Sequence, residues 1–283
     1  MIAAASRCLL DAAVFVSGSL CRALDGDGAE GAGMDSKDEE KRIAMTLARR
    51  AYLYGAFHVV FGGGVHEASA AQLFGENTAG ALAWLAGKVA ADEGLSEKSV
   101  GLSLRTMTEC VAEAVACVGE HSEGDAVSKA TVAMEEDFPT LFQVPGDSYV
   151  RPWESPYTST DGMLFRGSTL DVRSFYHQAG FRLQAEQHFP DDHISAMMDF
   201  MARMSQCVYE AYADGRDEDA AKTLRAQSDF LRTHVLTWVD AFADEVIRKD
   251  IRAYYAAFAG AMAAFAHVDA AYVEKLAAEL SAE

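Results

Sequence analysis

Residues 224–246 read LRAQSDFLRTHVLTWVDAFADEV, and the spacing of their apolar side chains decides the fold class. One stripe steps by three or four residues throughout, which is the period of an α-helix. Its members are Leu224, Gln227, Leu231, Val235, Trp238, Phe242 and Val246. Charged residues such as Arg225 and Asp244 fall elsewhere on the helical wheel. The pattern predicts one amphipathic helix over 224–246.

Helical spacing recurs on both sides of this stretch, and strand-like alternation is nearly absent. On the N-terminal side it predicts a helix from about 36 to 61 that Gly62–Gly64 ends, and helices near 68–91, 96–119 and 125–138. On the C-terminal side it predicts a helix from Ile194, capped by Asp191 or Asp192, and a last helix from about 255 to 276.

All five prolines lie between these two sets of helices, at positions 139, 145, 152, 156 and 190. Because proline lacks a backbone donor and clashes with the preceding helical turn, the stretch is predicted to be largely loop and hinge. The fold class predicted is therefore all-α, a single helical domain of two helical halves joined by a proline-rich hinge loop.

Composition excludes several classes of function. The chain has 283 residues, with 24 Lys and Arg against 43 Asp and Glu, for a formal charge of -19. Phosphate neutralisation needs a basic surface, so no nucleic-acid partner is predicted. The five cysteines are odd in number, scattered, and never form C-x-x-C. This usage is typical of a reducing compartment, and we expect a cytoplasmic protein without stable membrane insertion.

Residues 1–33 differ in composition from the rest of the chain. They carry a short apolar patch that Asp11 interrupts and a Gly/Asp-rich run, and no span approaches the ~20 apolar residues of a membrane helix. A signal peptide is disfavoured because Arg7 is the only basic residue before that patch. We expect 1–33 to be a poorly ordered extension or to lie upstream of the true start, and 34–283 to form the helical domain.

Sequence motifs for catalysis or cofactor binding are missing. The only Gly-Lys pair, Gly87–Lys88, is followed by Val89 rather than by the Ser or Thr of a phosphate-binding loop. The chain also has no Glu-x-x-His pair of a di-metal bundle, no H-E-x-x-H and no G-x-S-x-G. We therefore predict no enzyme activity, no catalytic residues, no cofactor and no metal. The weaker alternative is a metal at the cluster of His188, Asp191, Asp192 and His193.

Two segments combine aromatic residues, prolines and acids in the predicted hinge, a composition typical of recognition surfaces. One runs from Met134 to Gly146 and continues at Arg151–Tyr157, and the other spans Phe189–Ile194.

At these residues the sequence resembles the TorD/DmsD/NarJ-like family of redox-enzyme maturation chaperones, in its TorD-like branch. The shared elements are an acidic helix end before Leu-Phe and Pro-Gly, a Pro-aromatic-Glu-Ser-x-Tyr element, a Pro-x-Asp-His-Ile motif, and a late Phe-Leu-x-x-His-x-x-x-Trp-x-x-x-Phe helix. The matching residues are Asp137–Phe138, Leu141–Phe142, Pro145–Gly146, Pro152–Ser155, Tyr157, Tyr176, Gly180, Pro190, Asp192–Ile194, Phe200–Met201, Phe230–Leu231, His234, Trp238 and Phe242. One departure is Met197–Met198, where the family commonly has Glu-Leu.

The resemblance implies a cytoplasmic, cofactor-free chaperone that binds the twin-arginine signal peptide and the apo catalytic subunit of a molybdopterin oxidoreductase. It would assist cofactor insertion and prevent premature export. By family correspondence Asp192 and His193 belong to the peptide site, and four residues line or support it: Trp153, Glu154, Ser155 and Tyr157. Structural roles stay open, with Asp192 as a helix cap and Tyr157 as a pin for the hinge. An unperturbed His193 would also titrate near neutrality and couple client release to pH.

Two other readings remain open. The chain would act as an assembly factor for a mature molybdoenzyme subunit without recognising a signal peptide, or as a nucleotide hydrolase, since GTP binding has been proposed for the family. The resemblance also leaves open a monomer and a domain-swapped homodimer.

Overall fold

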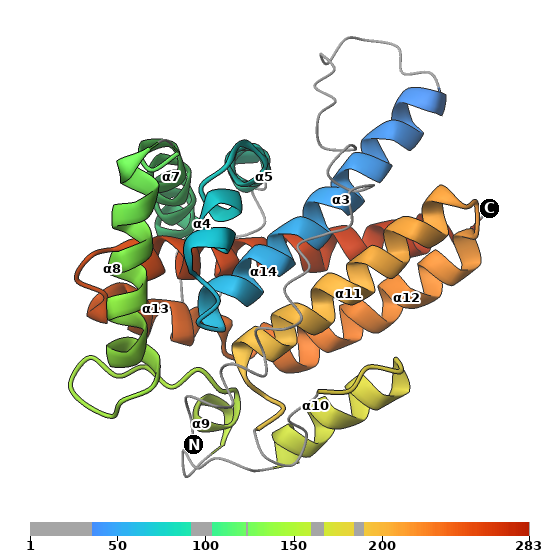
Figure 1. The fold of residues 1–283 in the computed structure, drawn as a ribbon. Helices are drawn as coiled ribbons and strands as arrows, with labels where there is room; N and C mark the ends of the chain where they lie inside the picture. The colour runs from blue at the N-terminus through green and yellow to red at the C-terminus, as the bar shows by residue number, and fades with distance from the viewer. Residues whose placement is uncertain (1–35, 92–103, 123, 160–166, 184–189, 283) are drawn as a thin grey trace.

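The chain folds into a bundle of α-helices in a computed structural model that describes residues 36–91, 104–122, 124–159, 167–183 and 190–282 (Figure 1). The predicted extension at 1–33 lies outside these residues. The helices are α3 (Ser36–Phe61), α4 (Glu67–Leu73), α5 (Glu76–Ala91), α7 (Leu104–Glu120), α8 (Asp125–Phe142), α9 (Ser155–Thr158), α10 (Gly167–Gln178), α11 (Ile194–Ala213), α12 (Asp217–Phe230), α13 (Val239–Lys249) and α14 (Tyr254–Glu279). The all-α prediction is confirmed.

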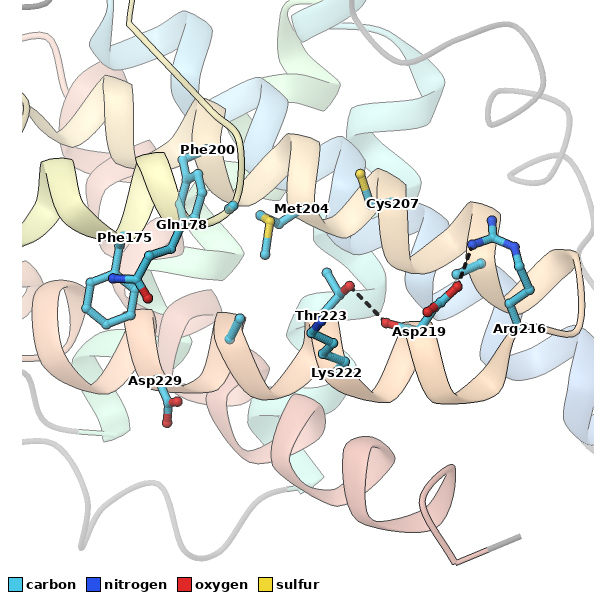
Figure 2. Close-up of a pocket in the computed structure, with 13 residues that line it drawn as sticks. Phe175, Gln178, Phe200, Met204, Cys207, Arg216, Asp219, Lys222, Thr223 and Asp229 are labelled. Atoms are coloured by element: carbon cyan, nitrogen blue, oxygen red, sulfur yellow. Dashed lines mark hydrogen bonds and ion pairs between the residues drawn. The ribbon is translucent and has the colours of Figure 1, made fainter.

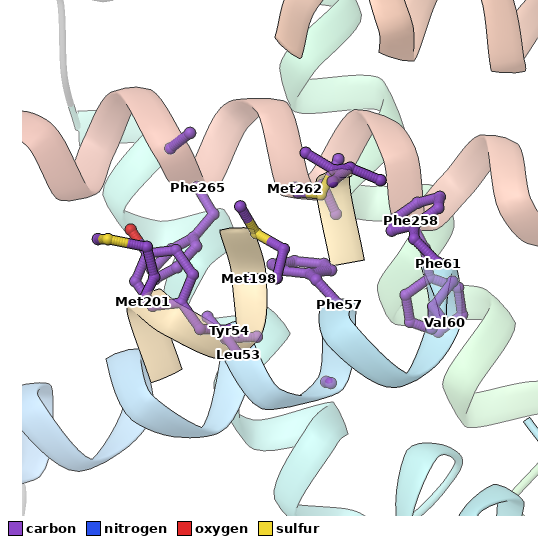
Figure 3. Close-up of a cluster of buried hydrophobic side chains, with 14 of the residues drawn as sticks. Leu53, Tyr54, Phe57, Val60, Phe61, Met198, Met201, Phe258, Met262 and Phe265 are labelled. Carbon is purple, nitrogen blue, oxygen red and sulfur yellow. The ribbon is translucent and has the colours of Figure 1, made fainter. Parts of the chain in front are cut away.

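The two predicted halves share one hydrophobic core. α3 packs along α11, and α14 packs against α7 as well as α12 and α13, so each half is completed by helices of the other. Figure 3 shows the centre of this core, where Tyr54 and Phe57 of α3 meet Met198 of α11 and Phe265 of α14. The rings of Tyr54 and Phe265 lie 4.8 Å apart in edge-to-face contact. The halves are therefore interleaved rather than placed side by side.

α14 is the most apolar helix of the core. By length and composition it could cross a membrane, and it is the one helix of the described residues that passes this test, but 89% of its apolar window is buried inside the protein. A buried core helix has the same composition. Gly260 lets α14 approach α7 closely, because a side chain there would collide with Cys110.

The end of α3 packs closely against the start of α11, and the predicted turn at Gly62–Gly64 makes this close approach possible. Gly63 adopts a φ of +73°, and the amide of Gly64 donates back to the carbonyl of Val59 at 2.9 Å, which closes the helix. A Cβ on Gly62 would lie 2.6 Å from Oγ of Ser195, so only glycine fits there. Nδ1 of His58 lies 2.9 Å from the carbonyl of Ser195, which ties the two helices together.

The prediction of one continuous helix over 224–246 is wrong, because the helix is interrupted. α12 ends at Phe230, a π-helical segment follows at Leu231–Val235, and α13 begins at Val239. The amide of Leu236 donates to the carbonyl of Leu231 at 2.9 Å, which is the longer π-helical bond. All seven residues of the stripe, six apolar ones and Gln227, are nevertheless buried.

Other predicted bounds also change. The helix predicted over 68–91 is divided between α4 and α5 at Phe74–Gly75, and the proline-rich stretch holds a 12-residue helix, α10. Pro139 lies in the last turns of α8 rather than ending it, and Pro156 occupies the first turn of α9, where no amide donor is needed.

A buried polar cluster crosses the core, and we call it the core cluster: Arg50, Tyr54, Gln227 and Asp269. Nη2 of Arg50 donates to Oδ2 of Asp269 at 3.1 Å and to Oε1 of Gln227 at 2.9 Å. The hydroxyl of Tyr54 donates to the same Asp269 oxygen at 2.6 Å. These bonds join α3, α12 and α14 where water has no access.

Candidate functional site

The proline-rich connector pairs with the residues just before α11. The amide of Glu154 donates to the carbonyl of Asp192 at 3.0 Å, and the amide of Ile194 donates to the carbonyl of Pro152 at 2.9 Å. These two bonds form an antiparallel β-bridge between Trp153 and His193, whose rings meet edge to face 5.4 Å apart. Two motifs nearly 40 residues apart in sequence are thus held side by side.

Asp192 fastens this pairing with its side chain, which is fully buried. Oδ2 accepts hydrogen bonds from the amide of Ser155, at 2.9 Å, and from the Ser155 hydroxyl, while Oδ1 accepts from Oγ1 of Thr169 at 3.1 Å. The prediction that Asp191 or Asp192 caps α11 is wrong. His193 is the N-cap, and its Nδ1 accepts from the amide of Ser195 at 3.1 Å.

The burial of His193 changes its chemistry. Desolvation, with a smaller contribution from the nearby charge of His58, lowers the pKa of His193 to about 3. The ring is therefore neutral at physiological pH. The idea that His193 titrates near neutrality and couples release to pH does not hold in this conformation.

Glu154 faces inward and meets the π-helical segment. Nδ1 of His234 lies 3.0 Å from Oε2 of Glu154, and both side chains are buried. Desolvation raises the pKa of Glu154, and the hydrogen bond from His234 opposes that rise. The carbonyl of His234 accepts from the Trp238 indole at 2.6 Å, so the π-helical turn serves both contacts.

We call Glu154, Ser155, Asp192, His193 and His234 the connector cluster. All five side chains are at most 6% exposed, so none of them offers a free polar group to solvent in this conformation. Trp153 and Tyr157 are the two predicted site residues that remain half-buried. Tyr157 donates to Oε2 of Glu245 at 3.0 Å and stacks on Trp238 with ring centroids 5.3 Å apart. The structure thus brings the six predicted residues into one region.

Three residues of α10 support the pairing. Tyr176 was matched to the family in the sequence, whereas Thr169 and Arg173 were missed because they lie in a stretch predicted as loop. Arg173 donates to Asp191 with Nε at 2.9 Å, and the hydroxyl of Tyr176 donates to the Asp191 carbonyl at 3.0 Å. Thr169 completes the set through Asp192. All three are on α10, whose helical spacing from Thr169 to Arg173 and Tyr176 was the available signal.

The metal alternative finds no support in the part of the chain that the structure describes. No group of three or more His, Cys, Asp or Glu side chains converges there. Asp191 and Asp192 are both engaged with other side chains, and His188 lies outside the described residues.

A groove opens beside the connector cluster, between α10, α11 and α12 (Figure 2). Its volume is about 550 Å³, within the range of ligand-binding sites. The apolar part of its lining comes from Phe175, Ala179, Phe200, Met204, Ala211 and Ala226. The Phe175 ring lies 5.2 Å from the His234 ring, so one lining residue of the groove contacts the connector cluster.

Comparison with known proteins shows what this helical chain is similar to. The family model described as nitrate reductase delta subunit matches residues 104–244, from the start of α7 into α13. The chain is 27% identical over 144 residues to the chaperone protein TorD of Photobacterium profundum and 29% identical over 153 residues to that of Vibrio cholerae. It is 29% identical over 124 residues to a probable Tat proofreading chaperone, DmsD, of Haemophilus influenzae.

These matches cover 51%, 53% and 44% of this chain and 65%, 66% and 54% of the relatives, respectively. The alignments thus span just under two thirds of the length of the two TorD chaperones and about half of the length of the DmsD chaperone. The range matched by the family model includes the connector, α11 and the late helical motif. These matches support the resemblance of the chain to the TorD-like family of redox-enzyme maturation chaperones.

Proposed function

We propose that this protein is a cytoplasmic chaperone that binds the twin-arginine signal peptide and the apo catalytic subunit of a molybdopterin oxidoreductase. It holds the client while the cofactor is inserted and prevents premature export. The observation that carries the proposal is the convergence of three separate motifs: Pro152–Tyr157 pairs with Asp192–Ile194, and His234 of the late motif bonds Glu154.

The buried members of this convergence act as positioning residues. Asp192, Ser155 and Glu154 hold the connector against α11 and the π-helical segment, which fixes the half-buried rings of Trp153 and Tyr157 in place. Aromatic side chains in such a position supply large contact area to an apolar peptide. We assign Trp153 and Tyr157 to peptide contact, and Glu154, Ser155, Asp192 and His193 to support of the site.

The charge of the chain suits a cationic client. A formal charge of -19 attracts a peptide that carries two guanidinium groups, and carboxylates bind such groups through paired, charge-assisted hydrogen bonds. Because the attraction acts partly over long range, rising salt should slow association.

The test is calorimetric titration of the full chain with twin-arginine leader peptides of molybdenum oxidoreductases from the same organism. We expect saturable binding of one leader, weakened at least tenfold when both arginines become lysine and when Trp153→Ala is introduced. Thr108→Ala, at an exposed position on α7 far along the chain from the connector, is the control variant. A folded protein that binds no leader would contradict the proposal.

A second candidate is favoured by the description of the matching family model, nitrate reductase delta subunit. In this reading the protein is an assembly factor that binds a mature molybdoenzyme subunit without recognising a signal peptide. Equal binding of the apo subunit with and without its leader, together with no binding of the isolated leader, would favour this candidate.

A further inference from the structure

We infer that the groove between α10, α11 and α12 binds the apolar segment of the signal peptide in one orientation. The arginine pair would lie at the end near Phe175 and Asp229, and the C-terminal end of the apolar segment would lie near Cys207. This inference rests on the proposed function and adds the place and the direction of the bound peptide.

The end of the groove beside the connector is acidic and open. Asp229 lines the groove there, and Asp171 on α10 is close enough for its charge to act on Glu154. Both side chains are exposed, and neither forms an ion pair with another residue of the described ranges. Asp229 therefore offers an open carboxylate at this end of the apolar groove, and a carboxylate can bind a guanidinium group through paired, charge-assisted hydrogen bonds. Asp171 adds negative charge beside the connector.

The opposite end differs in charge. Asp219 is already paired with Arg216, whose Nη1 lies 3.0 Å from its Oδ2, and Lys222 adds a further positive charge (Figure 2). Cationic residues of a peptide are not attracted to this end. The charge difference therefore sets the direction in which an apolar segment preceded by arginines would bind.

The dimensions of the groove also fit. Asp219 and Asp229 are ten residues apart on α12, which corresponds to roughly 15 Å along the helix axis. The apolar region of an export signal has about 7–15 residues, so in helical form it spans a similar length. The lining also includes Ala226 and Thr223 on α12, Met204 and Ala211 on α11, and Gln178 on α10.

The first test fills the groove. Thr223 lines its middle, and Thr223→Phe places a ring in the space that the peptide would occupy. Thr108→Phe, on an exposed position of α7, is the matched control. We expect Thr223→Phe to weaken leader binding at least tenfold and Thr108→Phe less than twofold, with unchanged melting temperatures. A bound leader with equal affinity for both variants would overturn the groove assignment while leaving the proposed function intact.

The second test determines direction without altering the lining. Cys207 is an exposed thiol in the groove, whereas Cys110 is buried. In the full chain Cys8, Cys21 and Cys117 are replaced by Ser. Two leaders are then made with a single cysteine each: the first carries it before the arginine pair, and the second carries it after the apolar segment. Each leader is mixed with the protein variant under oxidising conditions. We expect a disulfide from Cys207 to the second leader only. The reverse pattern, or no disulfide with retained binding, would overturn the inference, and no binding of any leader would remove the proposed function as well.

Discussion

The core cluster and the connector cluster are both buried and polar, but they hold together different kinds of structure. Arg50 and Asp269 connect helices α3 and α14, which apolar side chains already pack against each other. Asp192 instead joins two extended segments and α10, through bonds to Ser155 and Thr169. The helical core would keep much of its packing without its polar cluster, whereas the connector depends on polar bonds for its place.

This difference separates stability from function. Disruption of the core cluster should lower the free energy of unfolding of the whole domain. Disruption of the connector cluster should release the connector first, and with it Trp153 and Tyr157. Changes in the two clusters are therefore expected to affect unfolding and peptide binding to different degrees.

The largest expected effect is that of Arg50→Met. It leaves the carboxylate of Asp269 buried without its counter-ion, and removal of one partner of such a pair costs about 3–5 kcal/mol. Urea denaturation measures the loss. The double variant Arg50→Met, Asp269→Leu should recover most of it, since no charge then remains buried. A single variant within 1 kcal/mol of wild type would show that the ion pair does not stabilise the core.

Asp192→Ala should come next, at about 2–3 kcal/mol, because it leaves the Ser155 amide and the hydroxyls of Ser155 and Thr169 without an acceptor. Limited proteolysis should cut the connector sooner than the helices. Asp199→Ala, seven residues further along, removes one ion pair with the exposed Arg203 and is the matched control. Uniform cleavage across the chain would contradict a locally fastened connector.

A smaller effect depends on pH and on His193. Its pKa is about 3 in the folded protein and about 6.5 in the unfolded chain, so the unfolded state takes up a proton first as the pH falls. Its contribution is complete above pH 6.5 and is lost between there and pH 3, amounting to roughly 2 kcal/mol by pH 5.

The variant His193→Asn isolates this contribution. Asparagine caps helices well but does not titrate, so the free energy of unfolding should fall less between pH 7 and pH 5 than in wild type. Denaturation at both pH values measures the difference. An identical fall in both proteins would mean that His193 is accessible to protons in the folded state.

The smallest effect is expected outside both clusters. Arg248→Ala removes an exposed pair with Asp244 on α13, where Nε and Oδ2 are 3.0 Å apart. Such pairs contribute about 0.5 kcal/mol or less, and salt screens them. Denaturation in low and high salt should give nearly the same value for variant and wild type. A loss above 1 kcal/mol would show that surface pairs rival the buried clusters.

Much of the core followed from the sequence, because burial depends on helical period. The stripe from Leu224 to Val246 is buried as predicted, but the π-helical turn was not foreseen. A stripe with an apolar residue every three or four positions fits an α-helix and also fits a helix with one extra residue in a π-helical turn, so the spacing does not distinguish the two. What specifies the turn is tertiary, namely the contact of His234 with Glu154, 80 residues earlier.

The candidate site was located by family resemblance rather than by pattern. The motif residues Trp153 and His193 do lie together, but nothing local distinguishes a buried carboxylate such as Asp192 from an exposed one. Thr169 and Arg173 on α10 were missed because the neighbouring prolines favoured a loop. Bonds such as that of Thr169 to Asp192 depend on a chain path that local sequence does not encode.

The central claim is that the connector region and the adjoining groove form the client site, and amide hydrogen exchange of the full chain tests it most directly. The exchange of each peptide segment is compared with and without a saturating twin-arginine leader. We predict slower exchange in residues 152–158, α10 and the facing turns of α11 and α12, and no change in α5 or α7. Bound leader with protection confined to α5 and α7, or with no protection near Trp153, would contradict it.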